Sequence, residues 1–156
     1  MNTPAILVFE DGRTFIGTAF GAPGEVYGGA VFDTSLHYQR ALTDPRHHAQ
    51  VVISTTPHIG NVGWVDADAA ADAPTAIGYV VRDPAPRPSS WRADRPLADE
   101  LTAQGIVGIA GVDTRAITRH LRDRGPLRAG ISTIDLNPDS LLAKLRASID
   151  KEAENA

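Results

Sequence analysis

The stretch Ala5-Ile6-Leu7-Val8-Phe9-Glu10-Asp11-Gly12-Arg13-Thr14-Phe15-Ile16 places a strand, a turn and a second strand near the start of the chain. Residues 5–9 form a short apolar run, and Glu10-Asp11-Gly12 is a hairpin signal. The β-rich residues 14–20 then resume the strand pattern. The stretch therefore predicts a β-hairpin.

Strands and helices are predicted along the rest of the chain from hydrophobic pattern and turn residues. The strands are expected at 27–32, 50–55, 77–81, 106–110 and 127–133, and the helices at 34–42, 97–104, 115–124 and from Pro138 onward. Residues 57–63 and 83–88 are predicted to be loops without regular structure. Strands dominate the first half and alternate with helices in the second, so we expect an α/β fold, a mixed-sheet sandwich or barrel with flanking helices. We expect one domain over residues 1–150 and a frayed polar tail at 151–156.

Composition excludes several classes of function. The 156 residues include no Cys, which removes disulfides, thiolate metal sites and every cysteine nucleophile, including the thiol route from glutamine to ammonia. The net charge is -4, and no basic stripe interleaved with aromatic residues is visible, so nucleic-acid binding is not expected. No apolar run is long enough for a membrane helix or a signal peptide, and we expect a cytoplasmic protein.

Residues 33–44 gather side chains that could perform acid–base chemistry. Asp33, His37 and Asp44 are candidate catalytic residues, and Tyr38 lies between them. Spacing in sequence does not establish the geometry that such a set requires. The alternative is structural: Asp33 or Thr34 caps a short helix, and Asp44 caps the turn before Pro45.

Two further segments offer binding residues. His58 and Asn61 lie in the glycine-punctuated stretch 57–63, where the backbone could approach a ligand closely. Asp113 or Thr114 is expected to cap the helix that carries Arg115, with Arg119 and Arg122 on its solvated face. The neighbouring histidines at 47 and 48 would point to opposite faces of a strand, so no metal site and no cofactor are predicted.

Seven segments, in this order and spacing, resemble the N-terminal domain of the small chain of carbamoyl-phosphate synthetase. They are VFEDGRTFIGTAFG (8–21), GGAVFDTS (28–35), YQRALTDP (38–45), PHIGNVG (57–63), GYVVRDPAPRPSSWR (78–92), LADELTAQGIVGIAGVDTRAITRHLRDRG (97–125) and LRAGIS (127–132). The resemblance covers about residues 4–148. It implies a swivelling β/β/α fold, with a docking and structural role in pyrimidine and arginine biosynthesis. In that family a separate glutaminase domain releases ammonia and a large chain carries out the ATP-dependent synthesis.

The chain departs from the family pattern at two places. The family motif F-N-T-x-M-T-G-Y-Q-E is one residue shorter here, and His37 replaces its T-G pair. The family motif D-P-S-Y, whose serine helps to hold the glutamine of the neighbouring domain, reads Asp44-Pro45-Arg46-His47. Both changes fall where a family member would meet its glutaminase domain.

Two functions are compatible with this pattern. The first is a non-glutaminase docking or structural module for a synthetase large chain or a separate amidotransferase, with binding residues Tyr38, Arg46, His58, Asn61, Asp113 and Arg115. The alternative is a repurposed domain that binds a small molecule and catalyses an acid–base or cyclisation-type step through Asp33, His37 and Asp44. A third possibility is that the chain is one domain of a longer small chain.

Overall fold

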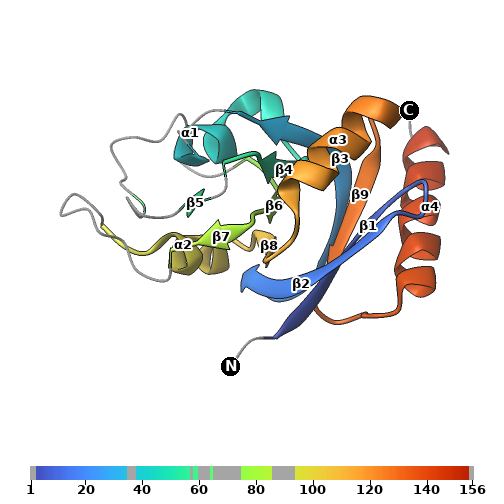
Figure 1. The fold of residues 1–156 in the computed structure, drawn as a ribbon. Helices are drawn as coiled ribbons and strands as arrows, with labels where there is room; N and C mark the ends of the chain where they lie inside the picture. Colours follow the sequence, from blue (N-terminus) through green and yellow to red (C-terminus); the bar gives the residue numbers. More distant parts are fainter. Residues whose placement is uncertain are drawn as a thin grey trace.

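A computed structural model describes residues 3–34, 38–56, 58–59, 64, 75–85 and 94–154. These residues form a mixed α/β fold, built as a closed barrel of seven strands with helices around it (Figure 1). The expected α/β class and barrel architecture are thereby confirmed. None of the described helices is both long and apolar enough to cross a membrane.

The barrel joins parallel and antiparallel strands. Around the barrel the order is β1 (Pro4–Phe9), β2 (Thr14–Gly21), β8 (Val107–Ala110), β6 (Gly78–Val80), β4 (Val51–Ser54), β3 (Glu25–Asp33) and β9 (Arg128–Ser132), which returns to β1. The pairs β3–β4, β4–β6 and β6–β8 are parallel, and the other four are antiparallel. The carboxyl ends of β3, β4, β6 and β8 therefore meet at one end of the barrel.

Helices and a small second sheet surround this barrel. They are α1 (Tyr38–Thr43), the 3-10 turn η1 (Pro45–His47), α2 (Leu97–Ala103), α3 (Thr114–Arg124), α4 (Pro138–Glu154) and the parallel pair β5 (His58–Ile59) and β7 (Asp83–Pro84). In Figure 1, α4 runs along one side of the barrel, whereas α1, α2 and the β5–β7 pair lie on the other side.

Strand β1 is buried on both of its faces, because it lies between β2 and β9 in the barrel and beneath α4 outside it. Ala5, Leu7 and Phe9 point into the barrel core. Ile6 and Val8 alternate with them and pack outside the barrel, in a cluster with Leu141 of α4. The apolar run at 5–9 thus serves two packing layers, which alternation along a strand makes possible.

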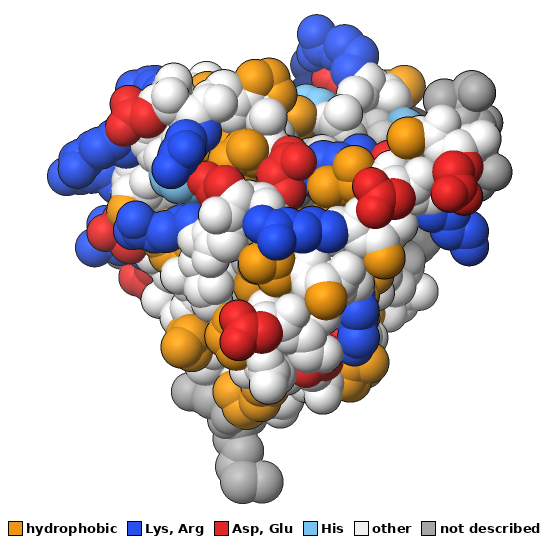
Figure 2. Space-filling view, turned by 90° about the vertical axis from the view of Figure 1, so that its right-hand side faces the viewer, with side chains coloured by type: hydrophobic (Ala, Val, Ile, Leu, Met, Phe, Trp, Pro, Cys, Tyr) orange, Lys and Arg blue, Asp and Glu red, His pale blue; other side chains and the backbone are white. Residues whose placement is uncertain are grey.

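Ion pairs and a cap hold α4 in place as well. The Asn137 side chain accepts hydrogen bonds from the backbone N–H groups of Asp139 and Ser140, at 3.0 and 3.1 Å, and so caps the helix. Lys144 Nζ lies 2.8 Å from Asp135 Oδ2. Figure 2 shows acidic and basic side chains intermingled over the upper part of this side of the molecule. The helix continues through Glu154, so residues 151–154 of the expected tail are helical.

Most predicted elements are confirmed, including the first hairpin and the three later helices. The prediction of irregular structure at 57–63 and 83–88 is wrong in part. The backbone of His58–Ile59 pairs with Asp83–Pro84 in a two-residue parallel ladder. Such a short pairing joins segments far apart in sequence and has no local periodicity that could reveal it.

Because β8 lies very close to β2, we expect two glycine substitutions to differ greatly in their effect on the free energy of unfolding. A Cβ atom at Gly108 would overlap the backbone carbonyl oxygen of Phe20, whereas at Gly29 the nearest atom would be the Gln50 side-chain nitrogen at 3.9 Å. We expect Gly108→Ala to lower the free energy of unfolding by about 3 kcal/mol or more, and Gly29→Ala to change it by less than about 1 kcal/mol. Urea denaturation followed by circular dichroism measures both; equal effects would contradict the close β2–β8 contact.

Candidate functional site

The carboxyl ends of the parallel strands β3 and β4 bring polar side chains together. Asp33 is aligned with Ser54 in the β3–β4 register. Thr55, the first residue after β4, donates two hydrogen bonds to the Asp33 carbonyl oxygen. One comes from its backbone N–H at 3.1 Å and the other from its hydroxyl at 3.0 Å. These bonds fix Thr55 beside the chain segment that carries Thr34.

Helix α3 is positioned over this edge by its cap and its apolar face. The Asp113 side chain accepts a hydrogen bond from the Ala116 N–H at 3.0 Å, so of the two expected caps, Asp113 and Thr114, the N-cap is Asp113. That bond, with smaller contributions from the charges of Arg82 and Arg115, lowers the pKa of the Asp113 carboxyl. Ile117 and Leu121 of the helix are buried against the barrel. Asp113 is thus occupied in holding the helix start.

A cleft of about 330 Å³ lies between α3 and the ends of β3 and β4. We call it the α3 cleft; it is lined by Thr34, Thr55, Arg115, Thr118, Arg119, Arg122 and Asp123. The Arg122 guanidinium also lies over the Phe32 ring, 5.8 Å from its centroid, and Phe32 is partly exposed. The cleft can accept an anion because three of its lining side chains are guanidiniums, which are strong bidentate donors.

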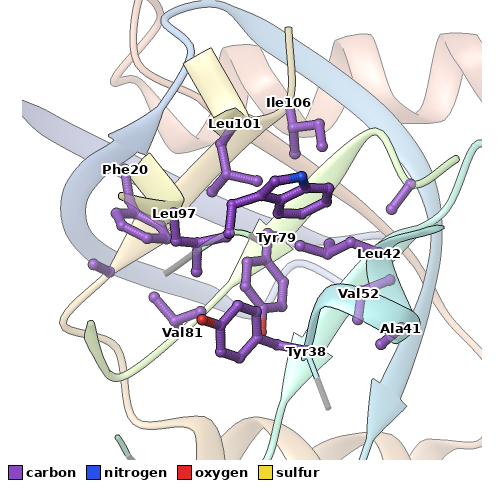
Figure 3. Packing of buried hydrophobic residues seen from close by; sticks show 13 residues of the cluster. Phe20, Tyr38, Ala41, Leu42, Val52, Tyr79, Val81, Leu97, Leu101 and Ile106 are labelled. Carbon is purple, nitrogen blue, oxygen red and sulfur yellow. The ribbon is translucent and has the colours of Figure 1, made fainter. Parts of the chain in front are cut away.

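Two tyrosines lie in the core near the same strand ends. Tyr38 and Tyr79 are 5% and 1% exposed, and Figure 3 shows them close together among the apolar side chains of this cluster. Burial raises the pKa of both phenols. The charge of Asp33 adds to this effect on the pKa of Tyr79. Tyr38, expected as a binding residue, contributes mainly to the core.

The turn that follows α1 is locked by an internal ion pair. Asp44 caps η1, as predicted, by accepting the Arg46 N–H at 2.9 Å. The Arg46 side chain returns to the same carboxylate, with Nη2 2.7 Å from Oδ2 and Nε 3.2 and 3.1 Å from the two oxygens. These hydrogen bonds from Arg46 lower the pKa of Asp44 to about 2. Asp44 is therefore an anion at neutral pH and a weak base, whereas Arg46 is 86% exposed.

The predicted site residues divide into separate places. Arg115 lines the α3 cleft. Asp33 is the last residue of β3, one of the two strands whose ends border the cleft, and Asp113 caps α3. Asp44 and Arg46 form their own turn, and His58 contributes its backbone to β5. His37 and Asn61 lie outside the described residues. Among the described residues, no group of three or more His, Cys, Asp or Glu could hold a metal ion.

Sequence reasoning did not single out Arg119, Arg122 and Thr55 as members of a site. Arg119 and Arg122 are exposed, as expected for a solvated helix face, but that face borders a cleft. The available signal was the spacing of Arg115, Arg119 and Arg122, which places them on one side of a helix. What lies opposite that side depends on the barrel topology.

Comparisons with known proteins find one family of similar sequences. The family described as "Carbamoyl-phosphate synthase small chain, CPSase domain" matches residues 7–131. The carbamoyl phosphate synthase small chain of Streptomyces coelicolor is 54% identical over 148 residues, which are 93% of this chain and 39% of that protein. The Streptomyces avermitilis protein of the same name is 51% identical over 99% of this chain and 41% of its own length. The Mycobacterium tuberculosis protein of the same name is 51% identical over 92% of this chain and 39% of its own length. The chain thus spans about two fifths of the length of these relatives.

The Asp44–Arg46 ion pair predicts a pH titration. Because the folded-state pKa is about 2, below the ordinary 3.8, the pair contributes stability that is fully present above about pH 4 and is lost as the pH falls toward 2. We expect the Asp44 carboxyl carbon, followed by NMR, to titrate near 2 in the parent protein and at a clearly higher pH in Arg46→Ala, still below 3.8 because the backbone N–H at position 46 remains. Lys151→Ala, which removes the same charge from the end of α4, is the control and keeps the low midpoint. A parent midpoint near 3.8 would refute the pairing.

Proposed function

The chain belongs to the carbamoyl-phosphate synthase small chain family, and we propose that it acts as a docking module without glutaminase chemistry of its own. Its partner is a synthetase large chain or an amidotransferase that supplies the glutamine chemistry. The role is that of a structural module to which this partner binds.

The observation that carries this proposal is the exposed Asp44–Arg46 turn. The turn replaces the family's D-P-S-Y motif, whose serine meets the glutaminase domain. Here the corresponding side chain is a guanidinium that is exposed and oriented by its hydrogen bonds to Asp44. A preorganised arginine loses little conformational freedom when a partner binds, and arginine is enriched among residues that dominate interface energies. The absence of any Cys among the 156 residues supports the non-glutaminase part.

The acid–base alternative receives less support. Asp44 is engaged by Arg46 and stays ionised at neutral pH, so it is a poor proton carrier there. Tyr38 faces the core and its raised pKa keeps it neutral. The catalytic roles of Asp33 and His37 stay predictions.

Size-exclusion chromatography tests the docking role. We expect the chain, mixed at about micromolar concentration with the large chain or the amidotransferase from the same cells, to co-elute with one of them as a stable complex. Elution of the chain apart from both would contradict the proposal.

Titration calorimetry on the same complex tests the part played by the turn. We expect Arg46→Ala to weaken binding about tenfold, because truncation of a preorganised interface arginine removes its contacts. Lys151→Ala, also exposed, serves as the matched control and leaves the affinity unchanged. Equal affinities for the parent and the Arg46 variant would place the interface elsewhere.

A further inference from the structure

The α3 cleft has a feature that the docking role does not use, a stripe of three guanidiniums. At about 100° per residue, Arg115, Arg119 and Arg122 fall within an arc of about 60° on the helix. The buried residues Ile117 and Leu121 occupy a different arc. The three guanidinium side chains therefore lie on one side of α3, apart from its buried face.

A third side of α3 faces the turn of the first hairpin. His120 Nε2 lies 2.7 Å from Asp11 Oδ2, and Arg124 Nε lies 3.6 Å from the same oxygen. These contacts tie α3 to the turn of the first hairpin. Arg124 is therefore a structural cation on the same helix, which makes it a natural control.

The arginines of the stripe have no carboxylate close by, in contrast to four other arginines of the described chain. Arg46, Arg95, Arg124 and Arg128 each have an Asp or Glu oxygen within 4 Å. Within the described part of the chain, no carboxylate oxygen lies that close to the guanidiniums of Arg115, Arg119 or Arg122. Three neighbouring like charges on one helix face repel one another, and a bound anion would relieve that repulsion.

The opposite wall of the cleft supplies hydroxyls. Thr34 and Thr55 follow the carboxyl ends of β3 and β4, and Thr55 is fixed there by its two bonds to Asp33. The Thr34 hydroxyl forms no hydrogen bond with any described residue, so it is available to donate to a ligand oxygen. Phe32, beneath Arg122, adds a partly exposed apolar surface at the rim.

We propose that the α3 cleft is a binding site for a phosphate monoester, whose dianionic head is held by Arg115, Arg119 and Arg122. The lining side chains carry three positive charges and one negative charge, that of Asp123, which leaves +2 to match a dianion. Guanidiniums bind phosphate oxygens in bidentate pairs. The volume of about 330 Å³ lies at the small end of the range for ligand pockets, so it suits a small molecule. The overall charge of -4 disfavours a nucleic acid as the source of the phosphate.

Titration with inorganic phosphate, followed by two-dimensional NMR of the whole chain at constant ionic strength, tests this site. We expect saturable shifts at the amides of α3, Thr34 and Thr55, with a dissociation constant of about 1 mM. Acetate, a monoanion, should bind at least about tenfold more weakly. Non-saturating phosphate shifts, or equal affinity for acetate, would overturn the proposal.

Two variants on α3 separate the stripe from the helix as a whole. Arg119→Gln should weaken phosphate binding about tenfold or more, whereas Arg124→Gln, which changes the cation beside Asp11, should leave it unchanged. If Arg119→Gln lowers the melting temperature, the phosphate affinity of Arg115→Gln tests the stripe instead. Parent-like affinity in both stripe variants would overturn the assignment, as would tighter binding of an oligoglutamate peptide than of phosphate. Each of these results is independent of complex formation with the large chain.

Discussion

Burial of strand β1 on both faces is the constraint on which the rest of the structure depends. Its backbone joins β2 to β9 and closes the barrel, while its alternating side chains fill the barrel core and the α4 interface at once. Because the barrel is closed, β3 and β4 have no freedom to splay apart. Their carboxyl ends then present a fixed edge to α3, and that edge is where the α3 cleft forms.

Local signals in the sequence predict most of the elements but little of their arrangement. The apolar run at 5–9, the Asp113 cap and the Asn137-Pro138 start mark elements that the structure contains. The closure of β1 with β9 pairs Leu7 with Ile131, and no pattern within a short window encodes such a distant partner. The β5–β7 pair was missed for the same reason.

The residues of the candidate site show the same difference between local structure, which the sequence predicts, and tertiary arrangement, which it does not. The cap role of Asp44 was predictable because an Asp before Pro has a known local bonding pattern, and the structure has that bond. The destination of each arginine was not predictable. Arg124 faces Asp11 from the hairpin, whereas Arg119, five residues earlier on the same helix, faces the cleft. Only the barrel topology determines which guanidiniums meet a carboxylate and which are left for a ligand or a partner.

The proposed phosphate site lies between α3 and the barrel, so it requires these two parts to move as one rigid body. Native-state hydrogen exchange in low denaturant tests this requirement most directly, by comparing the amides of Ile117 and Leu121 in α3 with those of Leu7 and Val8 in β1. A rigid scaffold predicts that both sets exchange only through global unfolding, with the same free energy and the same denaturant dependence. Exchange of the α3 amides through a smaller opening, while β1 stays protected, would contradict a preformed cleft.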